Sequence, residues 1–135
     1  MYHIWKGVDP LQYRLYREFF RALGNQTRFA IVQLLRQKPH YVNEIVERLG
    51  MEQSRVSHNL GCLLNCGFVE WEWLGKNKVY RLNPDLLPIM SGIEKHLARF
   101  APALDSCQVL EREAKPMVLV PKISLAGTLK PRRRK

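Results

Sequence analysis

The stretch GMEQSRVSHNLGCLLNC, Gly50–Cys66, decides how the chain is interpreted. Before it, apolar residues at helical spacing predict a short helix over Val42–Leu49, which Gly50 ends. Only Met51 and Glu52 then separate Gly50 from a second helical segment that begins at Gln53. Two helices joined by so short a turn are typical of a helix-turn-helix motif, whose second helix enters the major groove of DNA.

The helix predicted from Gln53 has an apolar stripe and a polar N-terminal half. Val56, Leu60 and Leu63 recur at i, i+4 and i+7, so they form the buried side. Arginine can donate two hydrogen bonds to guanine, asparagine can pair with adenine, and serine or glutamine can bond to bases or phosphates. Each residue taken singly also fits a solvated helix face. Together with the turn before them, they predict DNA contacts by Gln53, Ser54, Arg55, Ser57, His58 and Asn59.

The flanking segments complete the predicted fold. Upstream, helical spacing of apolar residues predicts helices over residues 11–23 and 25–37. Downstream, the apolar period changes to two, which predicts strands over residues 68–74 and 78–82, followed by a fifth helix over residues 86–100. The expected fold class is therefore mainly α with a small β-hairpin (α+β), a winged helix-turn-helix of four helices, two strands and a fifth helix.

Charge favours a polyanionic partner. The chain has 135 residues and a formal net charge of +10, which is typical of proteins that bind nucleic acid or anionic surfaces. The predicted hairpin turn adds Lys76, Asn77 and Lys78 beside the flexible Gly75. We expect these three side chains to contact phosphates or the minor groove of double-stranded DNA.

Composition also divides the chain. We predict a DNA-binding and dimerisation domain over residues 1–101 and a basic, proline-interrupted tail over residues 102–135, which ends in PRRRK. No run of about 18 apolar residues and no secretion signal is recognisable, so we expect a cytoplasmic protein without a membrane partner.

Three segments resemble the winged-helix core of the arsenic-repressor (ArsR/SmtB) family. They are ALGNQTRFAIVQLL, EIVERLGMEQSRVSHNL and CGFVEWEWLGKNKVYRLNP, which lie within residues 19–84. The resemblance implies a homodimeric transcriptional repressor that reads an inverted-repeat operator and dimerises through its first and fifth helices. The aromatic first helix and the amphipathic fifth helix fit such an interface. MarR-type regulators without metal sensing share the wing and are an alternative.

The resemblance also allows the family's metal sites to be checked by position. The family's cysteine pair on the third helix aligns with Tyr41 and Asn43, and neither is a thiol. The family's site on the last helix needs histidines after Asp85, where this chain has Leu87 and Ala98. We therefore expect no metal site of either familiar kind.

The remaining sensor hypothesis concerns three cysteines. Cys62 and Cys66 lie four residues apart on one helix, so two thiolates could share a soft metal or metalloid ion, with Cys107 as a third ligand. A redox version pairs Cys107 with one of the other two. The alternative is that Cys62 and Cys66 pack as small apolar side chains at the core end of the helix.

Other function classes fit less well. No glycine-rich phosphate loop, HExxH motif or paired catalytic acids occur, so an enzyme is not expected. A sequence-tolerant architectural DNA-binding protein would need only the positive charge, but that function does not explain the polar face of the helix from Gln53. The operator, the regulated genes and the inducer are not encoded in any motif.

Overall fold

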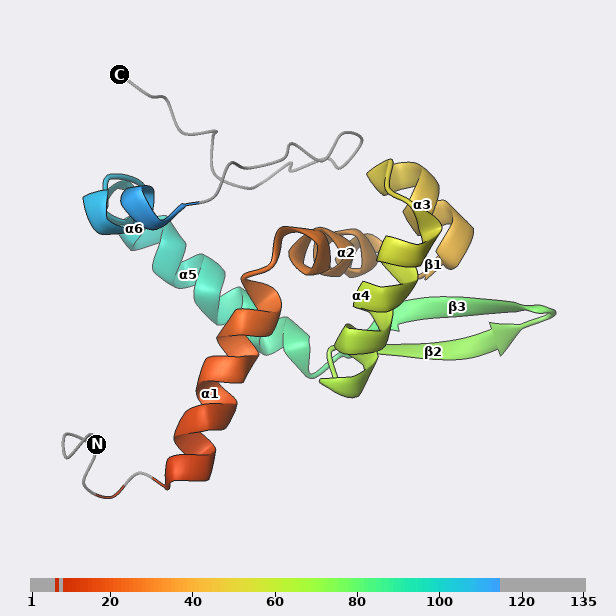
Figure 1. The fold of residues 1–135 in the computed structure, drawn as a ribbon, viewed down its shortest axis with the longest axis horizontal. Coiled ribbons are helices and arrows are strands. Elements are labelled where there is room, and N and C mark those ends of the chain that lie inside the picture. Colours follow the sequence, from red (N-terminus) through yellow and green to blue (C-terminus); the bar gives the residue numbers. More distant parts are fainter. Residues whose placement is uncertain (1–6, 8, 115–135) are drawn as a thin grey trace.

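The computed structural model describes residue 7 and residues 9–114 (Figure 1). The predicted segment beyond residue 114, including PRRRK, lies outside the described residues. The elements follow one another as α1 (Pro10–Leu23), α2 (Gln26–Gln37), β1 (His40–Tyr41), α3 (Val42–Leu49), α4 (Gln53–Asn65), β2 (Val69–Leu74), β3 (Asn77–Leu82), α5 (Leu86–Asp105) and α6 (Gln108–Glu113).

The helix-turn-helix consists of α3 and α4. Gly50 ends α3 in the left-handed conformation, with φ +62°, and its N–H donates to the carbonyl of Val46. Glycine adopts this conformation without the steric cost that a Cβ brings, which explains why the chain turns here and α4 begins three residues later. Because α3 and α4 are followed by the paired strands β2 and β3, the predicted winged helix-turn-helix is confirmed.

The core lies where α2, α3 and α4 meet over the sheet. Its largest fully buried side chains come from all three helices and from β1 and β2, and burial of one such aliphatic side chain stabilises the fold by about 1.5–3 kcal/mol. They are Ile31, Val32, Leu34, His40, Ile45, Leu49, Val56, Leu60, Leu63 and Val69. In α4 the buried residues include the three predicted from the apolar stripe.

Within residues 9–114 the sheet has three strands rather than the expected two, in the order β1, β3, β2. His40 and Tyr41 pair antiparallel with Tyr80 and Val79, so β3 is the central strand. A strand of two residues shows no apolar periodicity, and Pro39 beside it indicates a break. Strand β1 forms because the end of α2 brings residues 40 and 41 next to the free edge of β3. This pairing depends on tertiary contacts, so no local sequence pattern indicates it.

Helix α5 also differs from its predicted end at Phe100. It continues through Pro102 to Asp105, and the short α6 follows, so residues 102–113 contain helix within the segment predicted as tail. Proline lacks the N–H that would bond back to residue 98, but both residues are exposed and water can satisfy that carbonyl. A proline in an exposed last turn therefore does not have to end the helix, which explains why α5 extends beyond the end predicted from Pro102.

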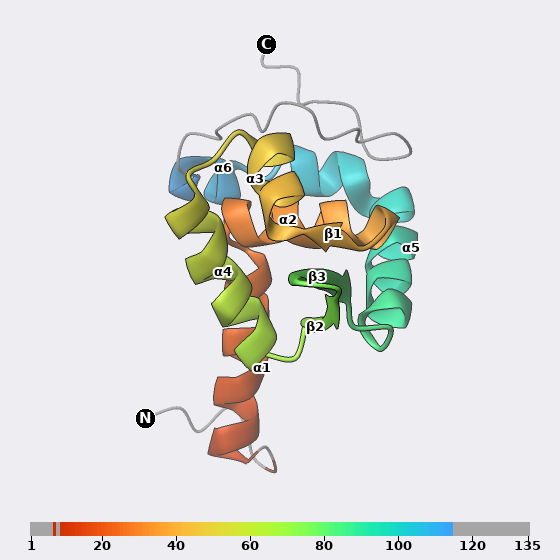
Figure 2. The same ribbon diagram turned by 90° about the vertical axis from the view of Figure 1, so that its right-hand side faces the viewer.

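Only the first part of α5 is anchored to the core. Leu86 and Met90 are its buried residues, and Arg36 of α2 forms an ion pair with Glu94. Figure 2 shows α4 and α5 on opposite sides of the sheet. The described part of the chain holds no helix both long and apolar enough to span a membrane.

His40 is a buried titratable group in this core. Its ring is 1% exposed, Nδ1 lies 2.7 Å from the carbonyl oxygen of Lys38, and Nε2 has no hydrogen-bond partner among the described residues. Burial lowers the pKa of His40 below its ordinary value, because the imidazolium loses hydration, although the hydrogen bond to the backbone of Lys38 and the charge of Glu44 oppose this effect.

We predict that acid destabilises the fold through His40. Below about pH 6.5 the unfolded chain binds a proton that folded His40 still excludes, so the free energy of unfolding falls until the pH reaches the lower pKa of the folded state. Urea titrations between pH 5 and 8 would show this slope in the wild type and in His96→Gln, whose histidine is exposed, and a smaller slope in His40→Gln. Equal slopes in all three proteins would contradict the assignment.

Candidate nucleic-acid interface

The exposed face of α4 carries four of the predicted DNA contacts. Gln53, Ser54, Ser57 and His58 are all exposed, while Val56 on the opposite side is fully buried. Because burial of the apolar stripe sets the rotation of the helix, Ser54, Ser57 and His58 face away from the core, and Gln53 is exposed at the first position of α4. That these four side chains contact DNA stays a prediction. Their exposure leaves them accessible to a DNA partner.

Arg55 is exposed but anchored at one point. Its Nη2 donates to the hydroxyl of Thr27, at 2.9 Å, and Thr27 is 2% exposed in the first turn of α2. The hydrogen bond uses one of the five donors of the guanidinium. Arg55 is therefore held beside α2 at the N-terminal half of α4, where a base-reading side chain has to lie.

Asn59, which is predicted to pair with adenine, instead makes its hydrogen bonds inside the protein. Its side chain is 7% exposed, its Oδ1 accepts a hydrogen bond from Nη1 of Arg28 at 3.2 Å, and its Nδ2 donates to the carbonyl of Arg55 at 2.8 Å. Both ends of the amide are therefore used inside the protein. The signal was present in the spacing, because Asn59 follows Val56 by three residues and so lies on the buried side of the helix.

Arg28 is a structural residue that sequence reasoning missed. Besides Asn59, its guanidinium donates from Nε to the carbonyl of Ala22 at 2.8 Å and from Nη2 to the carbonyl of Arg21 at 3.5 Å. Carbonyls at a helix C-terminus lack partners within the helix, so Arg28 satisfies the end of α1 while binding α4. One side chain thus joins three helices.

The hairpin formed by β2 and β3, here called the wing, separates its three predicted contact residues. Lys76 and Asn77 are exposed at the tip, next to Gly75 with φ +64°. Lys78 is half-buried, with its ammonium 4.3 Å from the ring centre of Trp71 and 5.5 Å from that of Trp73. Lys78 is therefore held against two aromatic rings, and Lys76 is the cation with the greater freedom to meet a phosphate.

The opposite face of the wing carries paired charges. Arg81 donates to Glu70 from Nε and to Glu72 from Nη1, each at 3.2 Å. Alternate residues of a strand point to opposite faces, so these carboxylates lie away from Trp71 and Trp73. The face with Glu70 and Glu72 thus carries two carboxylates and one guanidinium, whereas the aromatic face carries the ammonium of Lys78.

The three cysteines do not form one cluster. Cys62 and Cys66 lie together at the end of α4, whereas Cys107 precedes α6. Partial burial raises the pKa of the Cys66 thiol, and the charge and hydrogen bonding of Cys62 raise it further. Within the described residues, no three His, Cys, Asp or Glu side chains are arranged to hold a metal ion. The predicted three-thiol set is not assembled within one described chain.

An apolar groove lies between α1 and α5. Several of its aromatic and aliphatic side chains are highly exposed, including Phe20 at 62%, Tyr16 at 58% and Leu15 at 55%. Exposed apolar surface of this extent usually marks an interaction site. The groove is lined by Gln12, Leu15, Tyr16, Phe19, Phe20 and Ile89.

Comparison with known proteins connects this geometry to one family. Residues 25–70 match the family model described as "Bacterial regulatory protein, arsR family". A probable mercury resistance operon repressor of Streptomyces lividans is 36% identical over 90 residues, which cover 66% of this chain and 72% of the relative. The uncharacterized HTH-type transcriptional regulator Rv0081 of Mycobacterium tuberculosis is 33% identical over 93 residues, which cover 67% of this chain and 81% of that protein.

Solved structures show the same architecture. The crystal structure of Rv0081 from Mycobacterium tuberculosis has a TM-score of 0.63 and 30% identity, covering 79% of this chain and 100% of that chain. The homodimeric winged helix-turn-helix DNA-binding domain Mb0332 of Mycobacterium bovis, solved by NMR, has a TM-score of 0.58 and 25% identity, covering 70% of this chain and 90% of that chain.

We predict that Asn59 supports the fold. Asn59→Ala leaves the partly buried donor of Arg28 and the carbonyl of Arg55 without their partner, so the free energy of unfolding should fall by about 1–3 kcal/mol. Ser57→Ala, on the exposed face of the same helix, should change it by less than about 0.5 kcal/mol. Urea denaturation of the two variants measures both effects. If Asn59→Ala unfolds at the wild-type midpoint, Asn59 does not support the fold and its side chain is available to contact DNA.

Proposed function

This chain belongs to the arsR family of bacterial regulatory proteins, whose members are DNA-binding transcriptional regulators, and from that premise we propose that it is a homodimeric repressor of an inverted-repeat operator. The observation that carries the proposal is the exposed polar face of α4. Ser54, Ser57 and His58 lie opposite the buried stripe, and Arg55 is anchored beside them. A helix of this kind fits the major groove and presents its N-terminal half to base edges.

Dimerisation through α1 and α5 is supported by what these helices leave uncovered. Apart from Leu86 and Met90, no residue of α5 is buried, although Ile93, Phe100 and Leu104 are large and apolar. These side chains and the groove beside α1 would be covered by a second copy of the chain. A two-fold dimer places its two reading helices about one turn of DNA apart, which matches an inverted repeat.

The inducer of this repressor is proposed to be a thiol-binding ion. Cys62 and Cys66 are neighbours at the end of α4, and a relative is described as a probable mercury resistance operon repressor. Cys62 follows Asn59 by three residues on α4, so the thiol pair lies about one helical turn from the contact that Arg28 makes with Asn59. An ion that draws both sulfurs together can shift α4 from its DNA-bound position.

We predict sequence-specific binding that depends on Arg55. Titration of an inverted-repeat operator and a scrambled duplex at two salt concentrations should show a preference of about 10³ or more for the operator. Arg55→Ala should cost about 1–3 kcal/mol on the operator and reduce that preference, whereas Lys76→Ala should weaken both duplexes alike. A wild-type preference below about tenfold would instead support a sequence-tolerant architectural protein.

We also predict that thiol-binding ions release the operator through the Cys62–Cys66 pair. As(III) or Hg(II) should release the wild type and Cys107→Ser, while Cys62→Ser and Cys66→Ser should stay bound. Because the pKa of Cys66 is raised, ion binding must displace a proton and should strengthen as the pH rises. Peroxide and zinc serve as comparison treatments. Equal release of all three variants and the wild type would exclude the pair, and loss of release in Cys107→Ser would instead indicate a three-thiol site.

A further inference from the structure

Helix α1 carries a row of arginines that neither the fold nor the proposed reading of bases uses. Arg14, Arg17 and Arg21 are all exposed, and their spacing of three and four residues places them along one side of the helix. We call these three residues the arginine row. The only acidic residue of α1 is Glu18, which pairs with Arg21 at 3.3 Å. Among the described residues, neither Arg14 nor Arg17 is in an ion pair, so two full charges face solvent.

The arginine row lies on the side of α1 away from the proposed dimer interface. Given about 100° of rotation per residue, the groove residues of α1 lie at about 100–240° from Arg14, whereas Arg17 and Arg21 lie at about 300° and about 340°. Phe20 is the groove residue nearest the row, about 60° from Arg17. A second copy of the chain seated on the groove therefore leaves the row exposed. The row needs a different partner.

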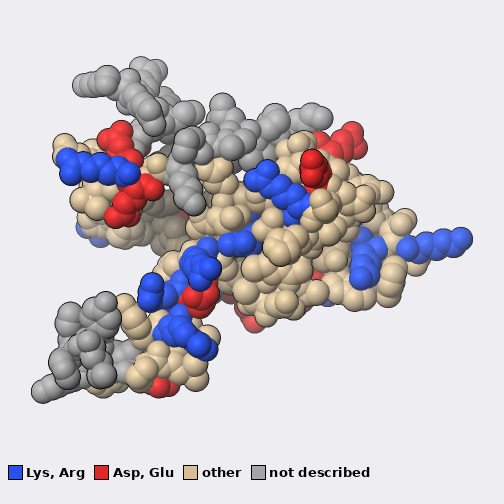
Figure 3. Space-filling model, viewed as in Figure 1, with Lys and Arg blue, Asp and Glu red and all other residues tan. Residues whose placement is uncertain are grey.

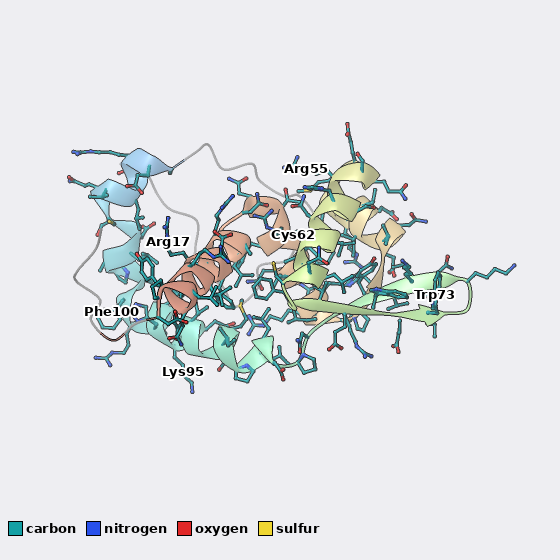
Figure 4. All side chains as sticks on the ribbon, turned by 60° about the horizontal axis from the view of Figure 1, so that its bottom comes forward. Arg17, Arg55, Cys62, Trp73, Lys95 and Phe100 are labelled. Atoms are coloured by element: carbon teal, nitrogen blue, oxygen red, sulfur yellow. The ribbon has the colours of Figure 1, made fainter. Side chains whose placement is uncertain are left out.

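The arginine row shares a face of the molecule with α4. In Figure 3, Lys and Arg side chains extend over α1, across the middle of the molecule and out to the tip of the wing. Figure 4 shows Arg17 and Arg55 directed toward one side and Lys95 of α5 directed toward the other. Arg28 ties the end of α1 to α4, so the row and the reading helix hold a fixed relation.

We propose that the arginine row binds the phosphate backbone of the same DNA duplex that α4 reads, outside the groove that α4 occupies. This inference rests on the proposed DNA-binding function and adds a second contact surface to it. Exposed guanidiniums at three-residue and four-residue spacing match a row of backbone phosphates and carry no base information. Their contribution is affinity that depends strongly on salt, on operator and unrelated DNA alike.

The test is the salt dependence of binding in charge-matched variants. Arg17→Gln and Lys95→Gln each remove one positive charge from an exposed side chain, and binding to the operator and to the scrambled duplex is measured by fluorescence anisotropy from 50 to 200 mM salt. The slope of log K against log salt is negative, and each lost phosphate contact makes it shallower by about 0.9. A dimer of Arg17→Gln loses two such contacts, so its slope should be shallower than that of the wild type by about 1.8. Arg14→Gln should behave similarly, and Arg17→Lys should keep most of the wild-type slope.

The inference predicts that Arg17→Gln weakens both duplexes by the same factor, while Lys95→Gln keeps the wild-type slope. An unchanged slope in Arg17→Gln, or the same decrease in Lys95→Gln, would overturn it. The proposed repressor function is judged separately, from the ratio of operator to scrambled binding in the wild type. The wild type can lack a preference for the operator while the two variants still differ in slope. It can also prefer the operator while the two variants have the same slope.

Discussion

The burial of one side of α4 is the constraint on which the rest of the structure depends. Val56, Leu60 and Leu63 are at most 1% exposed, and they close the core that α2 and α3 begin. Once these three residues are buried, the rotation of α4 about its axis is determined. Ser57 and His58, which lie on the other side of the helix, must then face outward, whereas Asn59 lies on the buried side. The surface proposed to read DNA is thus a direct consequence of core packing.

Arg28 extends that constraint to the helix that borders the proposed dimer interface. Its guanidinium contacts carbonyls at the end of α1 and the side chain of Asn59, so α1 and α4 cannot move independently without breaking a partly buried hydrogen bond. Such a bond costs about 1–3 kcal/mol when one partner is left unsatisfied. In the proposed dimer, the spacing of the two copies of α4 therefore depends on the same contacts that hold each helix in its own chain. Cys62 lies about one helical turn from Asn59, which makes the Cys62–Cys66 pair a suitable place for a signal to act.

Charge on the molecule is sorted by face rather than spread evenly. On the wing, Glu70 and Glu72 are paired with Arg81 on one side, while Lys78 rests on two tryptophan rings on the other. On α1, the arginine row lies opposite the apolar groove. A protein that holds a partner copy on one surface and a polyanion on another needs this separation, because a charge buried in an apolar interface loses its hydration.

The sequence by itself determined the helix-turn-helix, the wing and the apolar stripe of α4, because local periodicity and Gly50 report directly on backbone geometry. The tertiary structure alone decided the role of each polar side chain. Asn59 was predicted as a base contact and is buried, Lys78 is held by aromatic rings, and β1 exists only because β3 offers a free edge. The partners of these groups lie on distant segments, as Arg28 does from Asn59, so local spacing can place Asn59 on the buried side of α4 but cannot identify the residue that it contacts.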